Sequence, residues 1–417
     1  MNLNKLENFY IFLFSIIPLS IIIGPSISLV NILFLGIIFL IYVSNKKYNN
    51  FYSNQTFVIL ILIYFYLIFN SFIAVDFEKS MPRNFGFFRY ILFFLFFNLY
   101  VYKYKNIENV LAIWTIIILI VTLDSYIEVI FGKNLLGYGE IYKERVVSFF
   151  KDEPIVGGYL NGFLFIIIGY LSHKLFKHDL KLKIIFFLSI IFLLTCVLLT
   201  GERSNGIKAI FGILLFFLLN QKISLRNKII SMLSVIFFSL VVIFNSDYLK
   251  VRYGSQLFSQ IIDKDKREKY IEGNLYFKLY KSGYAVFKDY PIFGVGNKNY
   301  RVVTSNNITE KVNENYFVST HPHQFYFEVL SEHGLLGSLI FLSLLFFLVF
   351  KYLNVIIFSK NDIQLGCLVY LIINFLPILP SGSFFGDFNS TLFWINLSLM
   401  YACNPKTNIF QLNKKID

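Results

Sequence analysis

Long apolar runs recur along almost the whole chain, and they constrain its fold more than any other feature. A helix that crosses a bilayer needs about 20 mostly apolar residues. Runs such as Ile116–Ile120 are apolar on every face, without the alternation of a β-barrel strand. Segments of this kind lie at 8–24, 27–43, 56–75, 86–101, 109–131, 155–172, 183–200, 205–220, 229–244, 334–350, 363–380 and 387–403. The sequence therefore predicts an all-α, polytopic integral membrane protein with about 12 transmembrane helices.

The composition agrees with a chain whose main solvent is lipid. Of its 417 residues, 56% are hydrophobic and only 15% are charged, whereas a soluble domain has about 25% charged residues. A cytosolic enzyme and a fibre are thereby excluded. Cys196, Cys367 and Cys403 lie in apolar runs without the spacing of metal ligands. Neither a disulfide framework nor a metal centre is predicted, and no cofactor.

The excess of Lys and Arg over Asp and Glu indicates membrane topology rather than a nucleic-acid partner. The chain has 38 Lys and Arg against 25 Asp and Glu, a net charge of +13, which in a soluble protein would suggest nucleic acid. In a membrane protein, Lys and Arg gather in the short cytoplasmic loops. Most of these residues fall on one side if both termini are cytoplasmic. We therefore predict cytoplasmic N- and C-termini and no nucleic-acid partner.

This topology divides the chain into three parts. Residues 1–244 hold transmembrane helices 1–9, and residues 334–417 hold helices 10–12 and a cytoplasmic tail. Residues 245–333 form one large hydrophilic loop on the outer side. Within that loop, the apolar spacing from Leu275 to Phe287 predicts an amphipathic helix, and Pro291–Gly296 would end it.

Arginines and a lysine collect on the outer face. Burying an arginine near a membrane costs several kcal/mol unless it pairs or lines a wet cavity. Arg203 lies in a turn that is too short to need a cation, and Lys208 follows about one helical turn later. Arginine suits phosphate oxygens because its planar fork donates two hydrogen bonds at once. These residues, with Arg145 and Arg89, indicate an anion site such as a lipid diphosphate, although a sulfate or carboxylate ligand would fit the charges as well.

Titratable groups on the same face supply candidate bases. Histidine exchanges a proton near neutral pH, and His321 and His323 lie where the large loop returns to the membrane. Capping of the following helix is the alternative role for this pair. A third or fourth ligand is not spaced near them, so a zinc site is not predicted. Asp124 and Glu128 are interpreted as groups that position a helix or pair with arginine, rather than as catalytic acids.

Several motifs, taken in order, resemble the O-antigen ligase and polymerase family of bacterial envelope membrane proteins. The matching segments are Arg145–Phe150, Gly157–Leu160, Leu199–Ser204, Asp289–Gly296 and His323–Gly337. The chain departs from the family pattern at three positions. Gln324 replaces an asparagine, Tyr276 lies near the place of a loop arginine, and His321 is an additional histidine.

The resemblance implies a metal-independent, inverting glycosyltransferase related in architecture to the C-type membrane glycosyltransferases. The donor would be a glycan on undecaprenyl diphosphate, with membrane lipids around its polyprenyl chain. The acceptor would be a lipid A-core sugar hydroxyl in a ligase, or another lipid-linked glycan in a polymerase. The protein would lie in the bacterial inner membrane with its active site facing the periplasm.

The same resemblance assigns roles to individual residues. His323 would deprotonate the acceptor hydroxyl, and Arg203 would stabilise the departing diphosphate. The candidate substrate-binding residues are Arg145, Arg89, Lys208, His321, Glu202 and Gln324.

Two activities within the family, and one outside it, remain as alternatives. The segments Thr320–Gln324 and Pro380–Phe385 resemble a ligase more than a polymerase, so ligase is the prediction and polymerase the alternative. A lipid-linked oligosaccharide flippase or another transporter would need ionisable groups near the midplane and paired broken helices. The charges of this chain instead gather at one face.

Overall fold

The protein is described by a computed structural model over residues 3–44, 51–139, 145–176, 179–255, 273–305 and 313–411. Its first half contains α1 (Leu3–Ser15), α2 (Ile17–Ile23), α3 (Pro25–Ser44), η1 (Phe51–Ser53), α4 (Gln55–Phe72), α5 (Phe77–Phe85), α6 (Phe88–Tyr104), α7 (Glu108–Phe131), η2 (Ser148–Phe150), α8 (Val156–Leu175) and α9 (Leu180–Leu199). The second half contains α10 (Arg203–Leu219), α11 (Leu225–Phe244), α12 (Asp247–Leu249), the π-helical turn η3 (Lys250–Ser255), α15 (Leu275–Asp289), α16 (Tyr300–Thr304), α17 (Phe325–Phe350), α18 (Leu353–Phe358), α19 (Asp362–Asn374) and α20 (Asp387–Ala402).

Every regular element within these ranges is helical, so the predicted all-α class is confirmed. Eight of the described helices are long and apolar enough to cross a membrane. A ninth span results if α1 and α2, which meet at 41°, are counted together. The chain is a polytopic membrane protein.

All twelve predicted apolar segments coincide with helices, but three of these helices are short. The lengths of α10, α19 and α20 are 17, 13 and 16 residues, so the count of twelve spans stays a prediction. The segment predicted at 363–380 stops at Asn374. Pro377 and Pro380 follow within two turns and cannot continue a helix. Residues 375–386 therefore form a connection into α20.

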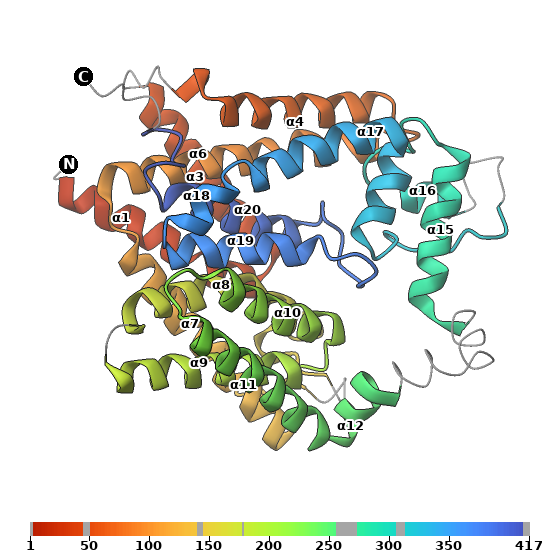
Figure 1. Ribbon diagram of the computed structural model, residues 1–417. Helices are drawn as coiled ribbons and strands as arrows, with labels where there is room; N and C mark the ends of the chain where they lie inside the picture. The colour runs from red at the N-terminus through yellow and green to blue at the C-terminus, as the bar shows by residue number, and fades with distance from the viewer. Residues whose placement is uncertain are drawn as a thin grey trace.

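Buried helices form the centre of the bundle. Most residues of α8, α19 and α20 are buried, as expected for helices that are apolar on all sides. Helix α19 packs on α8, and α20 packs on α6. The elements of the large loop, α15 and α16, lie at the end of the bundle opposite the beginning of α1 (Figure 1). This arrangement places residues 275–304 together on one face.

Two glycines join the large loop to the bundle. Helix α17 runs from Phe325 to Phe350 and kinks at Gly334, where φ is 64° and ψ is −168°, so the span predicted to begin at residue 334 is its second part. Its first part lies with α15 and α16, and its second part runs with the bundle (Figure 1). At the kink, the amide nitrogen of Leu335 donates to the carbonyl of Pro291 at 2.7 Å. A Cβ built on Gly334 would lie 2.5 Å from the nitrogen of Gly294.

We expect Gly334→Ala to destabilise the protein. The backbone angles at this kink belong to a region that is essentially restricted to glycine, and violating it costs about 1–3 kcal/mol before the clash with Gly294 is added. The apparent melting temperature in detergent should fall. Gly273→Ala is the matched control, because a Cβ there meets nothing within 4 Å. Equal melting temperatures for the two variants would contradict the interpretation of the kink.

Candidate active site

A cavity of about 330 Å³ lies at the end of the bundle that carries α15. Its walls come from the first turns of α8, α10, α15, α17 and α20, and from the last turn of α19. The sequence predicts eight site residues. Five of them line this cavity: Arg145, Glu202, Arg203, Lys208 and His323. Arg89, His321 and Gln324 do not line it. The cavity therefore brings together residues from segments far apart in the sequence.

The turn before α10 places Arg203 at the first helical position. Gly201 adopts φ +72° at the end of α9, and α10 begins two residues later. The carboxylate of Glu202 accepts hydrogen bonds from the Gly157 amide at 2.5 Å and from Asn205 Nδ2 at 2.6 Å. Glu202 thereby ties the beginning of α10 to that of α8. Arg203 is presented at the positive end of a helix, where an anion is favoured.

Burial determines the protonation of Glu202. Removal from water raises the pKa of this carboxyl to about 7, although its hydrogen bonds and the nearby Arg145 act in the opposite direction. The group is therefore partly protonated at neutral pH. Its negative charge only partly offsets the neighbouring cations.

Acidic residues of α7 hold the segment that carries Arg145. Glu128 accepts hydrogen bonds from the amides of Val147 and Ser148 at 2.9 and 2.6 Å. Asp124 accepts from the Ser148 hydroxyl and from the Leu135 amide. Asp124 and Glu128 therefore position the chain just after Arg145, in keeping with the interpretation of both as structural groups.

The cavity carries an excess of positive charge. Four cations line it, Arg145, Arg203, Lys208 and Arg252, against the single carboxylate of Glu202. Within the described ranges none of these four forms an ion pair with a carboxylate. Uncompensated cations that line a cavity are suited to an anionic ligand.

His323 lines the same cavity as these cations. Its backbone is left-handed, with φ +55°, a conformation that is uncommon outside glycine and is often found at functional sites. The Ser381 amide donates to the His323 carbonyl at 2.9 Å, and the Tyr276 ring lies edge-on at 6.2 Å between centroids. Burial lowers the pKa of the His323 imidazole, so the ring is neutral at neutral pH and can accept a proton.

The other two nominated residues of this segment support His323 from outside the cavity. The ring of His321 packs against that of His323, with 3.9 Å between centroids and the ring planes tilted by 31°. Burial, with the neighbouring His323, lowers the pKa of His321 to about 3. Gln324 caps α17, because its side-chain oxygen accepts from the Phe327 amide at 3.0 Å. The capping role considered for the histidines thus belongs to Gln324.

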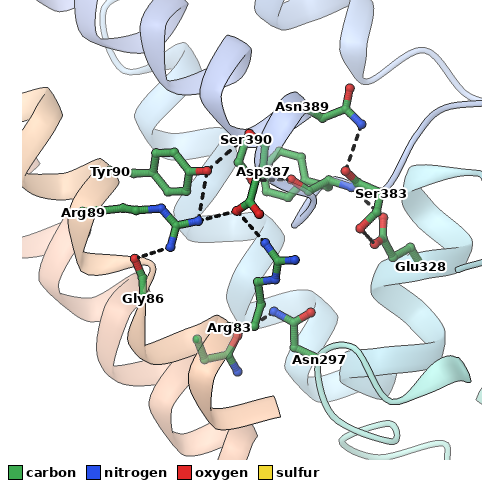
Figure 2. A network of polar contacts seen from close by, with 12 residues as sticks. Arg83, Gly86, Arg89, Tyr90, Asn297, Glu328, Ser383, Asp387, Asn389 and Ser390 are labelled. Atoms are coloured by element: carbon green, nitrogen blue, oxygen red, sulfur yellow. Dashed lines mark hydrogen bonds and ion pairs between the residues drawn. The ribbon is translucent and has the colours of Figure 1, made fainter. Parts of the chain in front are cut away.

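Arg89 is occupied elsewhere. Its Nη2 lies 2.5 Å from Asp387 Oδ1, and Nη1 donates to the Gly86 carbonyl at 2.8 Å. Arg83 reaches the same carboxylate oxygen at 2.7 Å. Figure 2 shows both arginines converging on Asp387 from α5 and α6. Arg89 therefore fastens these helices to the first turn of α20 and does not reach the cavity.

Glu328 fixes the loop that closes one wall of the cavity. This buried carboxylate accepts from the Ser383 hydroxyl and from the Phe384 amide, the latter at 2.9 Å. Figure 2 shows Glu328 and Ser383 next to the Asp387 cluster. Residues 380–384 are thus held against the first turn of α17, close to His323. This loop is the Pro380–Phe385 segment singled out in the sequence.

Some cavity residues were not nominated from the sequence. Arg252 lies in η3, and four asparagines contribute amide groups: Asn161, Asn205, Asn374 and Asn389. A signal existed for two of them, because Asn205 lies in the first turn of α10 and Asn161 in the second turn of α8, and both helices are otherwise apolar. Arg252 follows a span closely and looks like an ordinary loop charge. Among the described residues, no three His, Cys, Asp or Glu side chains cluster as metal ligands would.

A known protein family matches the middle of the chain, which contributes many of the cavity residues. A family model described as O-antigen ligase matches residues 188–342, a stretch that contains Arg203, Arg252 and His323. No curated protein matches the chain. The segment that is similar to the O-antigen ligase family, residues 188–342, therefore carries much of the cavity lining, His323 included.

Proposed function

We propose that the protein is an O-antigen ligase, which transfers a glycan from undecaprenyl diphosphate to a lipid A-core sugar hydroxyl. One observation carries this proposal. A neutral histidine and four cations, which form no ion pair with any described carboxylate, line the same cavity of about 330 Å³. The reaction needs both a base for a hydroxyl and positive charge for a diphosphate leaving group.

The proposed step is a single displacement. The acceptor hydroxyl donates its hydrogen bond to His323, which takes the proton as the hydroxyl oxygen attacks the anomeric carbon. The bond between that carbon and the phosphate oxygen breaks, and the electron pair leaves with undecaprenyl diphosphate. Arg203 and Arg145, together with Lys208, stabilise the charge that develops on the leaving oxygen. Attack opposite the leaving group inverts the configuration and requires no metal ion.

Deleting the gene tests the proposal and its alternative together. Loss of all polymeric glycan from lipopolysaccharide, with lipid-linked polymer accumulating, is the result expected for a ligase. Attachment of single repeat units would instead identify a polymerase, whose site would differ in its acceptor. Lipid-linked glycan that remains on the cytoplasmic leaflet would indicate a transporter. Complementation with the wild-type gene is the control.

The proposed site faces the periplasm, and we expect labelling from that side. Asn315 is exposed in the large loop, whereas Cys196 and Cys367 are buried. An Asn315→Cys variant, with Cys403 replaced by serine, should react with a membrane-impermeant maleimide in intact spheroplasts. Replacement of Cys403 alone is the unlabelled control. Labelling that requires lysis would place the loop in the cytoplasm and contradict the proposed orientation.

The pKa of His323 predicts the pH dependence of transfer. The active form has a neutral imidazole, and burial lowers its pKa below the ordinary value of 6.5. Activity should therefore persist as the pH falls through 6.5 and decline only at lower pH. The measurement is kcat/KM against pH in detergent, which reports the free enzyme. An acid limb centred at or above 6.5 would argue against His323 as the buried base.

A further inference from the structure

Arg252 reaches the cavity from a segment separate from the nominated arginines. It lies in η3, the π-helical turn that follows α12 just beyond the end of α11. π-helical turns are rare and are frequently found at functional sites. Its side chain lines the same cavity as Arg145, Arg203 and His323.

Two hydrogen bonds connect Arg252 to the turn that carries Arg203. Its Nη2 donates to the Gly201 carbonyl at 3.0 Å, and Nη1 of Arg203 donates to the Arg252 carbonyl at 3.4 Å. One nitrogen of the guanidinium is thus anchored. Its Nε is buried and has no hydrogen-bond partner among the described residues, although a buried polar group without a partner is costly. The guanidinium therefore keeps hydrogen-bonding capacity that these contacts leave unused.

The charge of the cavity shows what kind of ligand fits. Arg252 adds a fourth cation to a site whose one carboxylate is partly protonated. Arginine Nε and Nη groups match two oxygens of one phosphate in a bidentate manner. A singly charged carboxylate would leave most of this positive charge unbalanced, whereas a diphosphate carries several negative charges.

We propose that Arg252 is a binding residue for the diphosphate of the donor, acting with Arg203 across the Gly201 turn. This inference rests on the proposed function for the identity of the donor. It adds a contact from η3, and it makes the outer end of α11 part of the site.

Binding of a defined probe to the full-length protein in detergent tests the inference. The probe is farnesyl diphosphate, with farnesol as the uncharged comparison, and the readout is the dissociation constant from isothermal titration calorimetry. Loss of a charge-assisted contact weakens binding by about ten- to a hundredfold, which is the effect expected for Arg252→Gln. Arg252→Lys should lie between this variant and the wild type, since it keeps the charge but not the fork.

Lys250→Gln is the matched control. It removes the same charge from the same turn, but Lys250 is exposed, pairs with Asp247 at 2.9 Å and does not line the cavity. Its affinity for the probe should equal that of the wild type. If Arg252→Gln melts at a lower temperature, Arg252→Lys decides, because it can still donate to the Gly201 carbonyl. Wild-type affinity in both Arg252 variants would overturn the inference.

The inference and the proposed function fail in different ways. If the expected ranking of affinities holds but the wild type transfers no glycan from a diphosphate donor, the ligase proposal fails and Arg252 remains a diphosphate ligand. If the wild type transfers glycan and the Arg252 variants bind and react as it does, the ligase proposal stands and the inference about Arg252 fails.

Discussion

Replacement of His323 by asparagine is expected to abolish glycan transfer while the protein still inserts and folds. Asparagine tolerates the left-handed backbone found at this position, with φ +55°, so the variant removes the base without adding backbone strain. General-base catalysis contributes about 10²–10⁴-fold, and the rate should fall by that factor. The measurement is single-turnover transfer from a lipid-linked donor to purified acceptor.

Two further variants sharpen this test. His323→Ala should lose as much activity as His323→Asn, whereas His173→Ala, an exposed residue at the end of α8, should retain it. The ring of His321 packs against that of His323 but does not line the cavity, so replacement of His321 by alanine should cause a smaller loss. A larger loss at His321 than at His323 would exchange the two roles, and near-normal transfer by His323→Asn would rule out the general base.

Arg203→Lys is expected to fail although it preserves charge. The lysine ammonium is a point charge and cannot place two parallel hydrogen bonds on a phosphate. Loss of one preorganised donor at a developing negative charge costs about 10²–10³ in kcat. We expect the decrease mainly in kcat, since the contact strengthens as the leaving group departs.

Arg226→Lys provides the corresponding control, because Arg226 is exposed in the first turn of α11 and lies outside the cavity. It should transfer glycan at the wild-type rate. Full activity in Arg203→Lys would reduce Arg203 to a charge that marks topology. An increase in KM with unchanged kcat would place Arg203 in donor binding only.

The sequence alone predicted the helical class and the main residues of the cavity. Arg203 could be found because a turn of a few residues between two apolar runs has no other use for a cation. His321 and His323 could be found because few histidines occur, and the family resemblance chose His323 between them. These signals are local: each depends on a residue type that is unusual where it stands. They do not require knowledge of which helices are neighbours.

Long-range pairing could not be predicted in the same way. Arg89 and Asp387 are 298 residues apart in the sequence, so nothing near Arg89 reveals that its guanidinium is already occupied. Arg252 was missed for a different reason. A basic residue just after a transmembrane span is common, so nothing in the sequence around Arg252 marks it as a cavity residue. The predicted end of the eleventh span at residue 380 also overran Asn374, since the run stays apolar past the point where two prolines make a helix impossible.

The kink at Gly334 has a consequence for how the enzyme responds to its lipid. His323 belongs, through the first part of α17, to the layer that the loop forms above the bundle, whereas Arg203 begins a helix within the bundle. Membrane-spanning helices tilt to match the thickness of the hydrocarbon layer, and a loop layer outside that layer does not feel the same force. Under the proposed roles of His323 and Arg203, we therefore expect turnover to vary with the acyl-chain length of the surrounding lipid.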